Sequence, residues 1–252
     1  IYDPSENDIT IDMWKNSDGN KILDLYRKIQ KIDLSRDSKE ILKISLLTNS
    51  YVPTKNISND QFLKLKRDWL LENSDLNLIE KYLIKNQKTK NNEKLIKFLI
   101  NEYLSKSELG KSCKVLSKIN YPTEDKYLTK FNIYCLINNN KKEEAQLQYD
   151  LKKELGFKDD FFDKKFNYLM EYDLSIDETV SEATILDFHL SHRTNPNFSF
   201  EPNDSTSKKI WRYLSTSNLL TILSSSSVGV IFDSPISLSA ITGFLSFSGS
   251  TD

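Results

Sequence analysis

Residues 93–155 read EKLIKFLINEYLSKSELGKSCKVLSKINYPTEDKYLTKFNIYCLINNNKKEEAQLQYDLKKEL, and the spacing of their apolar side chains predicts four consecutive helices. Leu95 and Leu99, for example, lie four residues apart and therefore share one helix face. Polar turns such as Asn138-Asn139-Asn140 separate the apolar runs, and Gly156 follows the last run at a position that favours a helix C-terminus. The predicted helices cover residues 93–104, 108–119, 123–137 and 141–155.

The same alternation of helices and short turns extends in both directions along the chain. Ser58 has Gln61 three residues on, which is the form of a capping box and predicts a helix start. Ser74-Asp75 predicts the cap of the following helix, and so short a link predicts an antiparallel hairpin. Further helices are predicted at 22–29, 38–47, around 162–170, 185–190 and 210–214, with residues 195–202 as an extended connector pinned to a neighbouring groove.

The second helices of successive pairs begin near residues 75, 108 and 141, a spacing of about 33 residues that is close to the tetratricopeptide period. Ala145 and Tyr149 lie four residues apart, like the small and aromatic positions of that motif, but the rest of the signature is absent. A single helix pair cannot bury both of its faces, so neighbouring pairs must stack. The sequence therefore predicts an all-α fold, an α-solenoid of stacked antiparallel helix pairs that is tetratricopeptide-like in geometry, over residues 1–216.

The C-terminal residues differ in composition from the rest of the chain. Residues 213–252 contain no Lys, Arg or Glu, and twelve serines occur from Ser215 onward. We therefore expect residues 217–252 to form an irregular tail, which is a β-prone or disordered end, a membrane-apposed segment, or sequence not native to this fold. Asp233 and Pro235 interrupt its apolar run and argue against a membrane span, and no uninterrupted apolar run of about 18 residues occurs elsewhere.

The charge balance argues against one class of partner. The chain has 35 basic and 36 acidic residues, so its net charge of -1 gives no reason to expect nucleic-acid binding. Its Lys-rich helix faces are interpreted as solvated surface. Because the chain begins at Ile1, we expect either that a leader was removed or that the sequence is part of something longer. Removal of a signal peptide would imply a periplasmic or exported protein, and otherwise a cytoplasmic one.

The two cysteines, Cys113 and Cys135, each lie within an apolar helical pattern. Two cysteines are too few for a disulfide scaffold in a chain of this size. Two interpretations stay open, either packed free thiols or a single bridge between neighbouring helices.

Asp187, His189 and His192 form the most distinctive polar cluster and include both histidines of the chain. On a helix the two histidines lie on one face and would supply two metal ligands, but the spacing matches no known metal signature. Asp159-Asp160 and Glu143-Glu144 lie at predicted helix starts, where acids favour the helix dipole. No nucleotide-binding loop or nucleophile elbow occurs, so we expect a protein without catalytic residues, metal or cofactor.

Two stretches carry a resemblance to a known family. Ile11-Asp12-Met13-Trp14-Lys15 and Ala183-Thr184-Ile185-Leu186-Asp187-Phe188-His189-Leu190 resemble segments of a family of uncharacterised, exported helical-repeat proteins from alphaproteobacteria. The resemblance spans roughly residues 5–216, and the tail departs from the family pattern. It implies a lost signal peptide, a periplasmic setting and a missing C-terminal half, and it assigns no active site.

The leading hypothesis for function is a non-enzymatic scaffold whose concave face binds a protein or peptide, as helical repeats generally permit. The alternative is an accessory superhelical domain of a larger cell-wall-acting enzyme, such as a lytic transglycosylase, with its catalytic domain beyond residue 252. A third hypothesis, an enzyme in its own right, would depend on a pocket around Asp187, His189 and His192. The sequence does not predict an oligomeric state.

Overall fold

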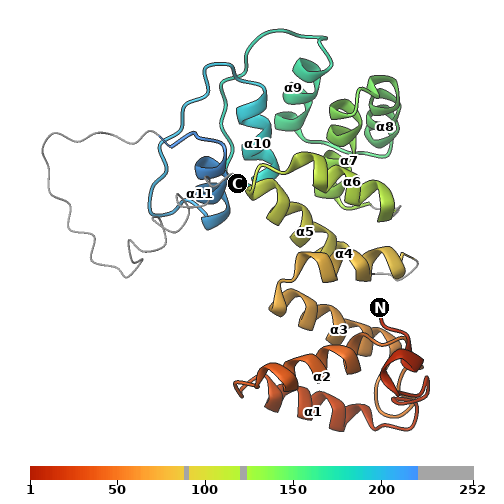
Figure 1. Ribbon diagram of the computed structural model, residues 1–252. Coiled ribbons are helices and arrows are strands. Elements are labelled where there is room, and N and C mark those ends of the chain that lie inside the picture. The colour runs from red at the N-terminus through yellow and green to blue at the C-terminus, as the bar shows by residue number, and fades with distance from the viewer. Residues whose placement is uncertain (88–90, 120–123, 221–252) are drawn as a thin grey trace, which may run out of the picture. The chain divides into compact units, whose positions relative to one another are not determined.

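The computed structural model describes residues 1–87, 91–119 and 124–220, and these residues form eleven α-helices and no β-sheet. The predicted all-α class is confirmed, with a solenoid-like stack of helices (Figure 1). A short 3-10 helix, Pro4–Asn7, precedes the α-helices. The helices are α1 (Gly19–Ile29), α2 (Arg36–Leu47), α3 (Asn59–Asn73), α4 (Leu76–Lys85), α5 (Glu93–Ser105), α6 (Leu109–Ile119), α7 (Lys126–Asn138), α8 (Lys142–Glu154), α9 (Asp160–Leu169), α10 (Ile185–Arg193) and α11 (Lys208–Thr216).

Side-chain caps fix where most of these helices begin. The Ser58 hydroxyl accepts from the backbone N–H of Gln61, whose side chain accepts from the backbone N–H of Ser58, so the predicted capping box is confirmed. Asp75 caps α4 as predicted. The predicted start of α7 near Thr123 is wrong, because Asp125 accepts from the backbone N–H of Leu128 and thereby sets the first turn.

The second helices of three successive pairs follow the predicted period. Helices α4, α6 and α8 begin at Leu76, Leu109 and Lys142, so each starts 33 residues after the previous one. The same spacing relates three second-helix side chains that are fully buried, Ile79, Ser112 and Ala145. The predicted small position at Ala145 is therefore confirmed as a buried contact between helices.

A left-handed residue reverses the chain within each of these pairs. Ser74, Ser107 and Asn140 have φ angles of 52°, 59° and 59°, and each lies two residues before the second helix begins. This backbone region favours glycine, because a Cβ atom crowds the following carbonyl oxygen. Polar side chains therefore occupy the turn position at which tetratricopeptide-like pairs usually place glycine.

Packing between pairs buries a continuous core. Helix α5 contacts α3, α4, α6 and α7, and α7 contacts α6, α8 and α9. The predicted hairpin of α3 and α4 has its two-residue link at Ser74-Asp75, but these two helices approach each other less closely than α5 and α6 or α7 and α8 do. Helix α3 packs on α5, and α4 packs on both α5 and α6, so successive pairs stack through both of their helices.

After α9 the chain returns to the first helices of the earlier pairs. Both α10 and α11 pack on α5, and α10 also contacts α9. Phe188 of α10 meets the rings of Phe198, Phe200 and Tyr213 edge to face, at centroid distances of 5.6, 4.9 and 5.7 Å. The segment 195–202 is therefore a connector pinned by its two phenylalanines, which contact Phe188 of the preceding helix. It is not extended throughout, because its first residues form a turn in which the backbone N–H of Phe198 donates to the Asn195 carbonyl.

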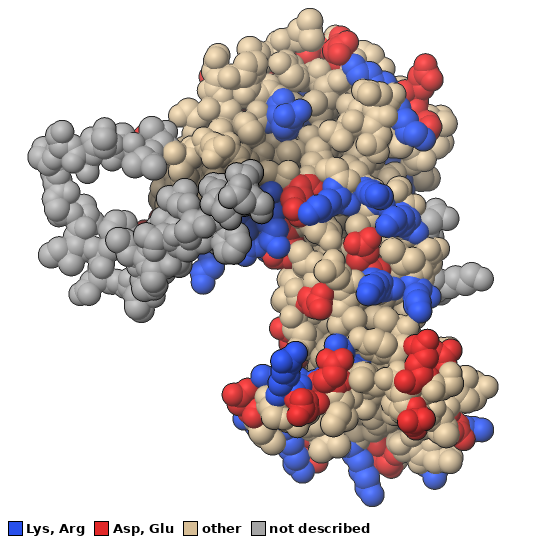
Figure 2. Space-filling model, in the orientation of Figure 1, with Lys and Arg blue, Asp and Glu red and all other residues tan. Residues whose placement is uncertain are grey.

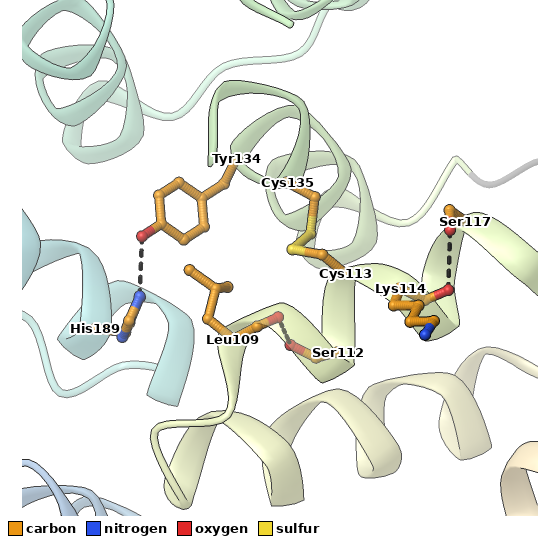
Figure 3. Close-up of a disulfide and its surroundings, with 8 residues drawn as sticks. All are labelled: Leu109, Ser112, Cys113, Lys114, Ser117, Tyr134, Cys135 and His189. Atoms are coloured by element: carbon orange, nitrogen blue, oxygen red, sulfur yellow. Dashed lines mark hydrogen bonds between the residues drawn. A yellow bond between two sulfur atoms is a disulfide. The ribbon is translucent and has the colours of Figure 1, made fainter. Parts of the chain in front are cut away.

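A disulfide joins two neighbouring pairs. Cys113 of α6 and Cys135 of α7 are bonded to each other and buried (Figure 3). The free-thiol interpretation is therefore wrong, and the bridge between neighbouring helices is the one that holds. The bridge closes a loop across residues 120–123, which lie outside the described residues.

The helical unit runs to Leu220, four residues beyond the predicted boundary at 216. Ser217 caps the end of α11, and Leu219 and Leu220 pack against the core. The rest of the predicted tail, residues 221–252, lies outside the described residues. No helix in the described ranges is long and apolar enough to cross a membrane.

Candidate functional site

Asp187 lies in a buried ion-pair cluster rather than beside the histidines. Its Oδ1 accepts from Nζ of Lys130 at 2.7 Å, and its Oδ2 accepts from the Thr184 hydroxyl at 2.8 Å. Lys130 also lies 2.9 Å from a carboxylate oxygen of Asp159. Burial alone would lower the pKa of Lys130. The carboxylates of Asp187 and Asp159 outweigh this effect, so the pKa lies above its usual value. The cluster ties α7 to α10 and to the cap of α9.

His189 is buried between two tyrosines. Its Nε2 lies 2.9 Å from the Tyr134 hydroxyl and its Nδ1 lies 2.9 Å from the Tyr213 hydroxyl, so both ring nitrogens are occupied. Nδ1 of His192 lies 2.7 Å from the same Tyr213 hydroxyl. Burial, with the charges of Arg193 and His192, lowers the pKa of His189 to about 3. Both rings are therefore neutral near pH 7, since burial and Arg193 also lower the pKa of His192.

Neutral rings satisfy every partner in this chain of hydrogen bonds. Tyr134 donates to Nε2 of His189, Nδ1–H of His189 donates to Tyr213, and Tyr213 donates to Nδ1 of His192, or all three bonds run in reverse. The network ties α10 to α7 and α11.

The structure does not bring Asp187, His189 and His192 together as one ligand set. Asp187 is held by Lys130 and Thr184, whereas the histidines face Tyr134 and Tyr213. Within the described part of the chain, no group of three or more His, Cys, Asp or Glu side chains has an arrangement that could hold a metal ion. Helical spacing alone suggested that cluster, and contacts from other helices divide it.

A groove on the face of the first helices was not predicted from the sequence. One cavity of about 250 Å³ lies between α1 and α3, and a second of about 410 Å³ lies between α3 and α5. Gln61, Lys64 and Asp68 of α3 line both cavities, so the two adjoin along this helix. We call this surface the α1–α3–α5 groove.

Polar contacts organise the α1 end of the groove. Glu72 accepts from the Tyr26 hydroxyl at 2.8 Å and from the Gln30 side-chain amide at 2.6 Å, which ties α3 to α1. Burial and the neighbouring carboxylates raise the pKa of Tyr26, so this phenol stays protonated. Lys64 and Asp68 pair with each other along α3 at 2.5 Å. This end of the groove has a fixed shape and largely satisfied charges.

Arg67 distinguishes the cavity between α3 and α5. Its side chain is only 7% exposed, and its Nη1 is buried without a hydrogen-bond partner among the described residues. Buried cations are normally paired, because desolvation of an unpaired charge is costly. Lys94, from α5, is exposed on the same cavity, whereas Lys97 pairs with Asp125 at 2.7 Å. Asp60, Asp68 and Glu93 line the same cavity, so its lining carries both signs of charge.

Little in the sequence points to this site. Arg67 occurs within Lys64-Leu65-Lys66-Arg67-Asp68, which resembles an ordinary charged helix face. Elsewhere on the visible face of the molecule, basic and acidic side chains are interspersed (Figure 2). Only the packing of α3 against its neighbours separates buried Arg67 from exposed Lys64.

Comparisons with known proteins assign no family to the chain. No protein-family model matches it, and no curated protein or solved structure does. The resemblance to exported alphaproteobacterial proteins stays a prediction.

Proposed function

We propose that this chain is a non-enzymatic scaffold that binds a segment of another protein, or a peptide, in the α1–α3–α5 groove. The observation that carries the proposal is the pair of adjoining cavities along one side of α3. Stacked helix pairs with a regular period generate extended binding surfaces of this kind. The groove joins apolar side chains, such as Leu23 and Leu71, with polar groups that would fix the orientation of a ligand.

The chain's own C-terminal helices support this use of the surface. Helices α10 and α11 lie on α5, and phenylalanines of the connector at 195–202 pack on α10. The surface of α5 therefore already binds another part of the same chain. The groove formed by α1, α3 and the start of α5 offers the adjoining surface to a partner protein.

We also propose a periplasmic or exported setting. The disulfide between Cys113 and Cys135 supports it, because disulfides persist in oxidising compartments and are rare in the cytosol. The partner would then be another protein of the same compartment.

Site-specific photocrosslinking tests the proposal. A photoreactive amino acid replaces Gln61, which lines both cavities, or exposed Lys114 on α6 as the matched control. We expect proteins of the source cells to crosslink from position 61 and not from 114, and Leu71→Arg to abolish that crosslink by filling the groove. Equal crosslinking from both positions, or a crosslink that survives Leu71→Arg, would exclude binding in this groove.

A further inference from the structure

We infer that the outward side of α8 is a second binding surface, and that it binds an amphipathic helix of another protein with basic residues beside its apolar stripe. This surface lies on a second helix of the stack, so the inference does not depend on binding in the α1–α3–α5 groove. Its basis is a row of exposed leucines that departs from the pattern of the preceding helix pairs.

Three leucines follow one another along the outward side of α8. Leu147, Leu151 and Leu155 are spaced at four residues, so they lie in a row on the helix. They are 60%, 46% and 80% exposed, whereas Ala145, on the side that packs into the stack, is fully buried. A single exposed leucine is ordinary on a protein surface, but an apolar row is typical of a contact with another molecule.

The period of 33 residues shows that the fold does not require leucine on this side. In the two preceding second helices the positions equivalent to Leu147 and Leu151 hold exposed lysines, which are Lys114 and Lys118 in α6 and Lys81 and Lys85 in α4. The same positions therefore face water in each pair. Helix α8 carries leucine where its two counterparts carry a solvated lysine, so packing of the stack does not explain these leucines.

The charged side chains beside the leucines are acidic. The exposed acidic residues of α8 are Glu143, Glu144, Asp150 and Glu154. All four lie within about 60° of Leu147 around the helix axis, because each residue turns the helix by about 100°. Glu144 pairs with Lys141 at 2.8 Å, whereas Glu143 and Glu154 have no ion pair among the described residues.

The lysines of α8 lie at its edges, away from the leucines. Three of them are half-buried, and these are Lys142, Lys152 and Lys153. They lie about 120–140° around the helix axis from Leu147. Lys142 pairs with Glu171 at 2.8 Å. Lys153 pairs with Asp163 of α9 at 2.5 Å. The side of α8 that is centred on Leu147, which we call the α8 face, therefore carries leucines and negative charge but no basic residue.

Charge selects the occupant of the α8 face. A second copy of the chain that paired through the same face would bring acidic side chains against acidic ones, which is unfavourable. A helix with an apolar stripe and adjacent Lys or Arg side chains would cover the leucines and pair with Glu143 and Glu154. The row from Leu147 to Leu155 is about 12 Å long at 1.5 Å per residue, so a helix of about nine residues covers it.

The chain's own α11 binds α5 by the same combination of contacts. Helix α11 has nine residues, and its buried side chains are Ile210, Tyr213 and Leu214. Beside them, Lys209 and Arg212 both pair with the carboxylate of Glu102, Arg212 at a distance of 2.6 Å. A short helix with basic residues on its flank is thus already a ligand of one helix of this stack. The α8 face has the apolar and acidic side chains for a second one.

A display library of surface-randomised helices of about 14 residues tests the inference. The library is selected on the whole chain, and enriched peptides are titrated against the wild type and three variants. Leu147→Lys/Leu151→Lys places the lysines of the preceding pairs on α8, Glu143→Gln/Glu154→Gln removes charge, and Leu25→Lys replaces an exposed leucine of α1 as the control. We expect enriched peptides with an apolar stripe and flanking Lys or Arg. Their affinity should fall about tenfold or more with the leucine variant and several-fold with the carboxylate variant, and remain unchanged with the control.

Thermal unfolding separates a binding role of the leucines from a structural one. Leu147→Lys/Leu151→Lys should melt at the wild-type temperature, because lysine occupies both positions in α4 and α6. A clearly lower melting temperature would mean that the leucines stabilise the fold, and it would overturn the inference.

Other results would also exclude the proposed partner. The inference is wrong if no enriched peptide distinguishes the wild type from the leucine variant, or if the enriched helices carry acidic or uncharged flanks. A dimer in light scattering that the leucine variant separates would make a second copy the occupant. Binding to phosphatidylcholine vesicles that the same variant abolishes would make the occupant a membrane surface.

Discussion

Arg212 of α11 and Glu102 of α5 form an ion pair across 110 residues of sequence, with Nη1 2.6 Å from Oε2. Lys209 shares the same carboxylate, which is 15% exposed. This contact holds α11 on α5. The start of α5, which α11 leaves uncovered, lines the α1–α3–α5 groove.

Glu102→Gln should weaken the attachment of α11. Loss of the charge leaves two cations at a partly buried site, so we expect the free energy of unfolding to fall by about 1–3 kcal/mol. Limited proteolysis should cut the connector at 195–202 faster in the variant. Glu144→Gln, which removes an exposed ion pair with Lys141, is the matched control and should cost less than about 0.5 kcal/mol. Equal losses in the two variants would show that the Glu102 contact does not hold α11.

His189 should make the protein less stable in mild acid. Its folded-state pKa of about 3 lies below the ordinary value of 6.5, so the unfolded chain binds more protons between these values. Stability is then complete above pH 6.5 and is lost as the pH falls, by about 1.4 kcal/mol for this group between pH 7.5 and 5.5. Denaturant titrations at both pH values should show a smaller change in His189→Gln. An identical change in the variant would contradict a neutral, buried His189.

The disulfide should contribute substantially to stability. Its sulfurs are separated by 22 positions in sequence, and closing a loop of that size stabilises by roughly 3 kcal/mol in the chain-entropy model. We expect the double variant Cys113→Ala/Cys135→Ala to melt at a lower temperature than the oxidised protein. Alkylation under denaturing, non-reducing conditions checks the bond itself. Two alkylated cysteines in protein purified from an oxidising compartment would exclude the bridge.

The left-handed turn residues predict a stabilising substitution. Asn140 has a φ of 59°, so Asn140→Gly should raise the free energy of unfolding by up to about 1 kcal/mol by relieving the Cβ contact. Its neighbour Asn139 has a φ of -93°, and Asn139→Gly should lower stability or leave it unchanged. Thermal unfolding of the two variants decides this. A gain for position 139 and a loss for position 140 would mean that the turn has another conformation.

Local signals predicted the repeating pairs well. The apolar spacing of the helices and caps such as Ser58 and Asp75 depend on residues close in sequence, so both could be found without tertiary information. The period of 33 residues followed from them and is confirmed by the helix starts. The sequence left the cysteine pairing open, because spacing along a chain does not fix which faces of two helices meet.

The site depended on distant contacts, which the sequence pattern does not encode. Lys130 lies 57 residues from Asp187, and its ion pair removes that carboxylate from the predicted cluster with His189. Likewise, nothing local distinguishes Arg67 from the lysines around it until α3 packs against α4 and α5. The return of α10 and α11 to α5 was missed for the same reason.

Hydrogen–deuterium exchange with a bound partner tests the central proposal most directly. The chain is measured alone and with the protein that crosslinks from position 61. Binding in the α1–α3–α5 groove predicts added protection of α3 at 60–71 and of α5 at 93–97, with no change in α6. Protection confined to α6 or α8, with α3 unchanged, would contradict it.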